Sequence, residues 1–133
     1  MRDSGNAGTA GRSGTPPDSG LPRSRRLTAS RRFQEVFEKG RSQAGPYVVL
    51  WVCPAEGAGP RLGVVASRRA LRRAVDRNRA KRLLREAFRL NRSRFRTGVD
   101  VVLVARSRIA GVRRQDVERD LLALAGKMGL LRD

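Results

Sequence analysis

Apolar residues recur along the chain at two different spacings, which predict a mixture of helices and strands. In three stretches they lie three or four positions apart, as on the buried face of a helix. In three others they form short β-branched or aromatic runs, as in strands. The predicted elements are, in chain order, a helix that Thr28 or Ser30 can cap and Gly40 can end, a strand Tyr47–Val52, a strand Arg61–Ser67, a helix Arg72–Asn91, a strand Val99–Ala105 and a helix from about Arg113.

The order α-β-β-α-β-α predicts a single α+β sandwich in which one sheet packs on helices. The Gly- and Pro-containing turn at residues 56–60 predicts that the first two strands pair as a hairpin. The strand–helix–strand segment that follows predicts a parallel pair, so the sheet would be mixed. Residues 1–22 are rich in Gly, Ser, Thr, Ala and Pro and carry no net charge, which predicts a disordered tail before a domain at 23–133.

The charge of the chain narrows the choice of function. Its 133 residues include 30 Lys plus Arg and 12 Asp plus Glu, a formal net charge of +18 that indicates a polyanionic partner. It has no His, and Cys53 is its one Cys, which excludes a His general base, an intramolecular disulfide and a Cys-based zinc site. No apolar run approaches the roughly 20 residues of a membrane span and no secretory signal is visible, so we expect a cytoplasmic protein.

The predicted helix Arg72–Asn91 has one apolar face and one basic face when its residues are placed at 100° intervals. The arginines on one face repel one another and so oppose helix formation. Their presence there therefore favours the hypothesis of a phosphate-bearing ligand. The alternative is a solvated arginine-rich face without a ligand, because Arg outnumbers Lys throughout the chain. The apolar face comprises Leu83, Leu84, Ala87 and Phe88, and the opposite face comprises Asn78, Arg82, Arg85 and Arg89, flanked by Lys81 and Arg92.

Several segments of the chain resemble the bacterial ribonuclease P protein component. Residues 77–89, which read Arg-Asn-Arg-Ala-Lys-Arg-Leu-Leu-Arg-Glu-Ala-Phe-Arg, are similar to the Arg-Asn-Arg signature helix of that family. Two departures are Arg73, where the family often has Gly, and the replacement of many family Lys residues by Arg. Further similar segments, in the same order as in the family, are 26–28 and 33–37 with Gly40 in the first helix, 62–69 and 73–75 before the signature helix, and 100–106 in the last strand.

The resemblance implies a function. Proteins of this family are the protein subunit of ribonuclease P, and they help a large catalytic RNA to remove the 5′ leader of precursor tRNA. The chain would then be the accessory subunit of an endoribonuclease whose catalytic groups lie in the RNA. The implied partners are the catalytic RNA subunit and precursor tRNA, with a monomeric protein in the particle and no membrane contact. No cofactor would be carried by the protein, and Mg²⁺ would act mainly through the RNA subunit.

The resemblance also implies a fold and a set of RNA-binding residues. The fold would be ribosomal protein S5 domain 2-like, with a left-handed β-α-β crossover in place of the usual right-handed one. Guanidinium groups would bind phosphates of the catalytic RNA, and aromatic side chains between the first helix and the sheet would stack on leader bases. The residues implied for the catalytic RNA are Arg68, Arg69, Arg72, Arg77, Asn78, Lys81, Arg82, Arg85 and Arg89, and those for the leader are Phe33, Phe37 and Tyr47.

Other interpretations of the same residues are open at this point. A structural or ribosomal RNA-binding protein without a processing role would share the charge. An autonomous ribonuclease could cut RNA with Arg, Lys and Tyr47 in place of His. Phe33 and Phe37 could be ordinary core residues, since aromatic side chains at i and i+4 that face a sheet are often simply buried. Trp51 and Cys53 are predicted to lie in the core.

Overall fold

The computed structural model describes residues 30–55 and 60–132 as one α+β domain. The predicted tail at 1–22 and the candidate cap Thr28 lie outside the described residues. The elements are α1 (Ser30–Lys39), β1 (Arg41–Ala44), β2 (Val48–Pro54), β3 (Arg61–Val65), α2 (Ala74–Asn91), β4 (Val99–Ala105) and α3 (Arg114–Lys127), with short 3₁₀ turns at Arg92–Arg94 and Ser107–Ile109.

The predicted elements are all present, most of them with shifted ends, and one strand is additional. The predicted bounds of β4 are confirmed. α2 begins two residues later than predicted because Arg73 has an extended backbone, with φ −87° and ψ 135°. The additional strand is β1, whose Arg-Ser-Gln-Ala sequence is exposed at all four positions and has no apolar alternation. Backbone pairing to β2 along the sheet edge holds it in place.

The sheet is mixed, and its strand order is β1-β2-β4-β3. β2 is antiparallel to both β1 and β4, whereas β3 and β4 form the predicted parallel pair across α2. The predicted hairpin between β2 and β3 is wrong, because β4 lies between them. β4 is apolar on both faces and is buried at five of its seven positions, so it is most stable with a neighbour on each side. The handedness of the crossover through α2 stays a prediction.

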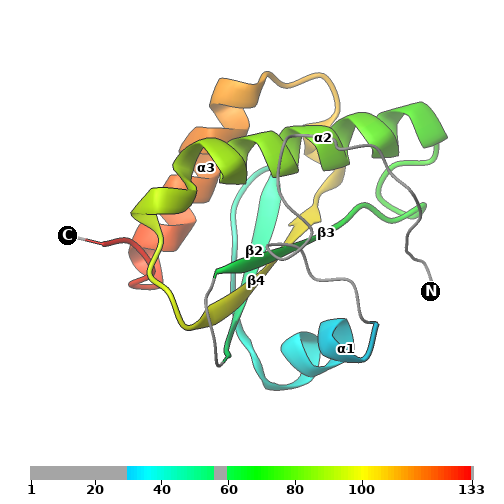
Figure 1. Cartoon of the computed structure of the whole chain (residues 1–133). Coiled ribbons are helices and arrows are strands. Elements are labelled where there is room, and N and C mark those ends of the chain that lie inside the picture. The colour runs from blue at the N-terminus through cyan, green and yellow to red at the C-terminus, as the bar shows by residue number, and fades with distance from the viewer. Residues whose placement is uncertain (1–29, 56–59, 133) are drawn as a thin grey trace.

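Helices cover the two faces of the sheet unequally, as Figure 1 shows. α2 and α3 pack on one face, and their side chains form the large core with alternate residues of β2 and β4. The predicted inward residues of α3, which are Val117, Leu121, Leu124 and Met128, are all buried there. Among the described helices, α1 is the one that packs on the other face, around a small cluster of Val36, Cys53 and Val102. Because α1 is short, several apolar side chains on its side of the sheet stay partly exposed to solvent.

Within the part of the chain that the structure describes, no helix combines the length and the apolar character needed to cross a lipid bilayer.

Candidate nucleic-acid interface

The two faces of α2 are divided as the sequence predicts. Ala80, Leu84, Ala87 and Phe88 are buried against the sheet and α3. Leu83, which was also predicted to face inward, is half-buried and packs against the same core. The helix is therefore fixed along its length by apolar contacts, and its outer face needs no protein partner for stability.

The outer face of α2 presents polar and basic side chains, but they are not equivalent. Asn78 and Arg82 are exposed, whereas Lys81 and Arg85 are half-buried and each makes a contact within the chain. Arg89 is exposed, but its guanidinium is paired with Glu86 one turn earlier on the same helix. The carboxylate partly neutralises the positive charge at this end of the row.

The segment before α2 brings three more predicted arginines to the N-terminal half of α2. Arg68, Arg69 and Arg72 are exposed in the connection from β3 to α2. The backbone turns tightly here: Ser67 O accepts a hydrogen bond of 2.9 Å from the Leu71 N–H, and Ser67 Oγ accepts one from the Ala70 N–H. Buried Leu71 anchors the turn to the core.

Arg77 differs in role from its neighbours, although it belongs to the predicted set. Its Nη1 donates hydrogen bonds to the carbonyl oxygens of Leu71, at 3.0 Å, and Arg72, at 2.8 Å. The side chain therefore ties the first turns of α2 to the connection before it. The term "α2 surface" is used below for the exposed residues that this arrangement holds together, which are Arg68, Arg69, Arg72, Asn78 and Arg82.

The side of the sheet that α1 covers has an aromatic cluster. Phe33 is half-buried against the small core under α1, and Phe37 is 38% exposed. The ring of Phe37 meets that of Trp51 edge to face, with their centroids 5.2 Å apart. Trp51 was predicted to be core and was not among the site candidates, yet it is only partly buried. These three residues, Phe33, Phe37 and Trp51, form what is called here the aromatic face.

Tyr47, the third predicted leader residue, does not lie with Phe33 and Phe37. It precedes β2 and packs against the large core on the α2 and α3 side of the sheet. Its backbone N–H and that of Val48 both donate to Asp120 Oδ2 of α3, at 3.0 and 3.1 Å. Tyr47 lies before the first residue of β2 and so outside its alternation, which turns Val48 and Leu50 to the large core and Trp51 to the α1 side.

A buried carboxylate joins α1 to the sheet at the other end of this side. Asp100 of β4 is 1% exposed, and two arginines bind it from different elements. Arg32 Nε of α1 donates to Oδ2 at 2.6 Å, while Arg61 of β3 donates from Nε to Oδ1 at 2.9 Å and from Nη2 to Oδ2 at 2.8 Å. Arg32, Asp100 and Arg61 are called the Asp100 clamp below.

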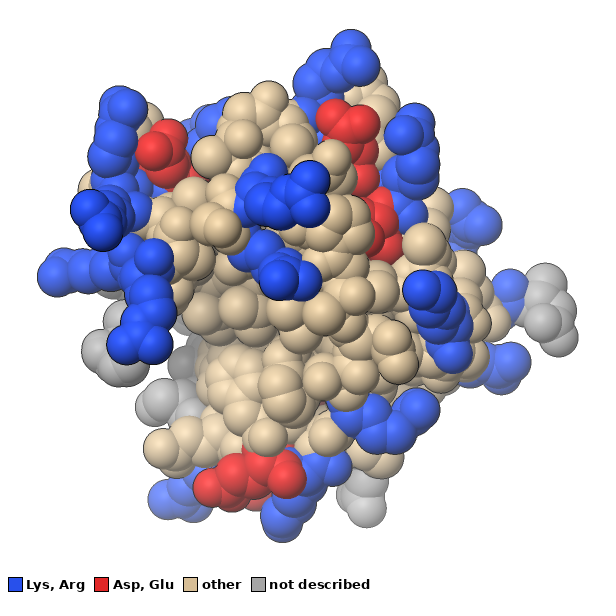
Figure 2. Space-filling view, turned by 180° about the vertical axis from the view of Figure 1, so that it is seen from behind, with Lys and Arg blue, Asp and Glu red and all other residues tan. Residues whose placement is uncertain are grey.

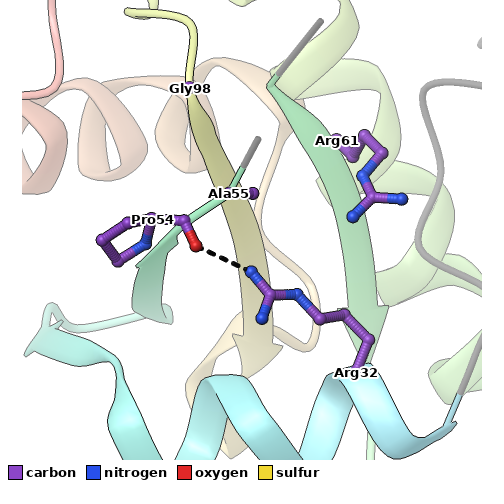
Figure 3. Close-up of a pocket in the computed structure, with 5 residues that line it drawn as sticks. All are labelled: Arg32, Pro54, Ala55, Arg61 and Gly98. Carbon is purple, nitrogen blue, oxygen red and sulfur yellow. Dashed lines mark hydrogen bonds between the residues drawn. The ribbon is translucent and has the colours of Figure 1, made fainter. Parts of the chain in front are cut away.

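The Asp100 clamp borders an open hollow of about 430 Å³. Figure 3 shows Arg32 and Arg61 approaching the hollow from opposite sides, with Arg32 donating to the carbonyl oxygen of Pro54 at 2.9 Å. The remaining lining residues are Ala55 and Gly98. Since Arg32 also donates to Glu35, each of the two guanidinium groups here is matched by one carboxylate. The hollow therefore has little excess charge with which to bind an anion.

Hydrogen bonding to Asp100 raises the pKa of both Arg32 and Arg61 above the ordinary arginine value, and partial burial of each side chain opposes this. A cation whose pKa is raised by folding stabilises the folded chain at every pH below its unfolded pKa. That stabilisation is lost only as the pH rises through the raised value, in the strongly alkaline range. The two arginines of the Asp100 clamp therefore remain charged throughout the neutral range.

Basic side chains are not confined to α2. Seen from behind, the molecule has Lys and Arg side chains around much of its outline and also near the middle of the view, with an uncharged area below these (Figure 2). Charge alone therefore does not locate an RNA site on this protein. The α2 surface is distinguished by its fixed geometry, and the aromatic face by its partly exposed rings.

Proteins of known family resemble this chain in sequence and in fold. The family model described as Ribonuclease P matches residues 21–129. A ribonuclease P protein component from Lachnoclostridium phytofermentans is 37% identical over 71% of this chain and 80% of its own length. The solved ribonuclease P protein of Staphylococcus aureus superposes with a TM-score of 0.72 at 26% identity, covering 81% of this chain and 98% of that one. That of Thermotoga maritima gives 0.67 at 31% identity, covering 74% and 92%.

Proposed function

The chain belongs to the ribonuclease P protein family, whose members work with an RNA subunit in maturing the 5′ end of tRNA. We propose that two of its surfaces bind two different RNAs. The α2 surface binds the catalytic RNA subunit. The aromatic face binds the single-stranded leader of precursor tRNA. One copy of the protein acts in each particle, in the cytoplasm.

The observation that carries the first assignment is the fixed position of the β3–α2 connection. Arg77 and Ser67 hold its backbone, so that Arg68, Arg69 and Arg72 stay beside the exposed side of α2. Arginines on a rigid backbone lose less entropy on binding phosphates than arginines on a mobile loop. A folded RNA, whose phosphates also have fixed positions, is the partner that benefits most from this arrangement.

Two observations support the second assignment. Phe37 and Trp51 expose parts of their rings on a side of the sheet that α1 covers incompletely. Aromatic surfaces stack on bases of any kind, which suits a site that must accept leaders of many sequences. Of the residues predicted for the leader we retain Phe33 and Phe37 in this assignment, and we assign Trp51 in place of Tyr47.

We further propose that the bond-breaking chemistry belongs to the RNA subunit and its Mg²⁺. The described residues bring together no group of three or more His, Cys, Asp or Glu side chains that could hold a metal ion. Asp100 is bound by two arginines, and Asp120 by two backbone N–H groups. The described residues therefore do not fit a metal site of that kind, and we route no step of the reaction through a metal ion held by this chain.

Reconstitution tests the proposal. The full chain is incubated with precursor tRNA, with the cognate RNA subunit, and with both in the presence of Mg²⁺. We expect accurate 5′ cleavage at low Mg²⁺ only when the RNA subunit and protein are both present, and none with protein alone. Cleavage by the protein alone would identify an autonomous ribonuclease. RNA binding without any effect on cleavage would indicate a structural RNA-binding protein.

A further inference from the structure

The attachment of α1 to the rest of the protein is small, and one part of it is ionic. The apolar part consists of Val36 packed on Cys53 and Val102, with Phe33 and Trp51 at its margin. The ionic part is the Asp100 clamp, in which an arginine of α1 reaches a carboxylate of β4. The orientation of α1 on the sheet therefore depends on contacts at two places, centred on Arg32 and Val36, which lie about one helical turn apart.

Arg32 makes its hydrogen bonds in three directions. Nη1 donates to Glu35 on its own helix, Nε to Asp100 in β4, and Nη2 to the Pro54 carbonyl at the end of β2. The last two bonds cross from α1 to two different strands. Since a guanidinium is planar and rigid, bonds from two of its edges fix both the position and the rotation of the helix that carries it.

We propose that Arg32 is a positioning residue for leader binding: through Asp100 and Pro54 it fixes the angle of α1 and thereby the spacing between Phe37 and Trp51. Phe33 follows Arg32 directly in the chain, and Phe37 lies on the same helix. A rotation of α1 would move both rings against Trp51, which is held in the sheet. This inference rests on the proposed leader-binding function of the aromatic face.

Arg32 can be removed without leaving the buried carboxylate unpaired. Arg61 binds Asp100 through two hydrogen bonds that do not involve α1, so Arg32→Gln retains a charged partner for Asp100. Asp100→Asn, in contrast, would disturb both arginines and the sheet itself, and it is the less informative variant. Arg31→Gln is the matched control, because Arg31 is the exposed neighbour on α1 and its loss removes the same charge from nearly the same place.

The test uses the reconstituted holoenzyme and two precursor tRNAs, one with a leader of about ten nucleotides and one with a single-nucleotide leader. For Arg32→Gln we expect the KM of the long-leader substrate to rise about five- to tenfold, with kcat and the KM of the short-leader substrate unchanged. Arg31→Gln is expected to change the long-leader KM less than twofold. Arg32→Lys, which keeps the positive charge but replaces the planar guanidinium by a single amine, is expected to give an intermediate KM.

A second measurement reports on α1 in the protein alone. The chain has one tryptophan, so its fluorescence comes from Trp51, whose ring meets Phe37 of α1. We expect Arg32→Gln to shift the emission to longer wavelength, because the ring gains contact with water when α1 loosens, and we expect Arg31→Gln to leave it unchanged. This measurement needs no substrate, and circular dichroism shows whether each variant is folded.

The outcomes separate the positioning role from the proposed function. If the wild-type holoenzyme fails to distinguish the two leader lengths, the leader assignment itself is wrong. If it does distinguish them, three results would overturn the positioning role of Arg32. These are an unchanged long-leader KM in Arg32→Gln, an equal rise for both substrates, and an equal rise in Arg31→Gln.

Discussion

Replacing Arg68, Arg69, Arg72 and Arg82 together by Gln is expected to weaken binding to the RNA subunit by about three orders of magnitude at physiological salt. Each residue is exposed in the α2 surface and makes no ion pair with the acidic side chains that the structure describes. A hydrogen bond to a charged group contributes on the order of 1 kcal/mol or more, and about 4 kcal/mol corresponds to roughly a thousandfold in affinity. Filter binding or fluorescence anisotropy with the cognate RNA measures the change.

The salt dependence of the same binding identifies the contacts as phosphate contacts. The slope of log K against log salt is negative, and each lost phosphate contact should reduce its magnitude by about 0.7 to 0.9. The fourfold variant should therefore have a slope that is shallower by about 3. The single change Arg82→Ala should weaken binding and make the slope shallower by about 1. Arg119→Gln is the control, because this α3 side chain is 80% exposed and lies outside the α2 surface. An equal loss of slope in Arg82→Ala and Arg119→Gln would show that binding depends on overall charge.

Arg77 shows where the family resemblance grouped residues that the structure separates. It is one more arginine of the signature segment, although the 100° spacing places it seven residues before Leu84, on the apolar side of the helix and away from Arg82. In the structure its guanidinium binds two carbonyl oxygens of the preceding connection, which is a local role. Such a bond depends on the path of a loop, and the path of an irregular loop has no periodic pattern in the sequence.

The regular elements could be predicted because burial imposes a period on them. The apolar side of α2 and the continuous apolar run of β4 both predicted their positions in the fold. The pairing of strands is a long-range property, and β4 inserts between β2 and β3 from some 35 residues further along the chain. β1 left no apolar signal, because an exposed edge strand is held by its backbone alone.

The buried carboxylate of Asp100 carries structural information that is visible in the sequence. Asp100 interrupts the apolar run of β4, and an ionised side chain is rarely buried without a charged or strongly hydrogen-bonding partner. This pattern could have predicted that an arginine from another element binds it, though not which one. The misplacement of Tyr47 comes from the predicted start of the strand. In a strand that began at Tyr47, Tyr47 and Trp51 would share a face, but β2 begins at Val48 and Tyr47 lies outside its alternation.

Gly40→Ala is expected to be among the most destabilising single substitutions in the chain, lowering the free energy of unfolding by about 3 kcal/mol. The sequence predicted Gly40 as the end of the first helix, and α1 does end at Lys39. The Gly40 N–H donates to Val36 O at 2.8 Å, and a Cβ on Gly40 would lie 2.6 Å from Val52 O and closer still to Val36 O. Both oxygens belong to the backbone, so neither can move aside as a flexible side chain could.

The control for Gly40→Ala is the same substitution at Gly126 in α3, where the opposite sign is expected. A Cβ there would meet nothing closer than Leu131 Cδ1, at 4.0 Å, and alanine favours the helix over glycine by about 0.5 to 1 kcal/mol. For a domain of this size, Gly40→Ala should lower the Tm by about 15 °C, and Gly126→Ala should raise it by a few degrees. Thermal unfolding followed by circular dichroism measures both. Equal destabilisation at the two sites would mean that the loss of glycine, rather than the close approach of α1 to β2, determines the effect.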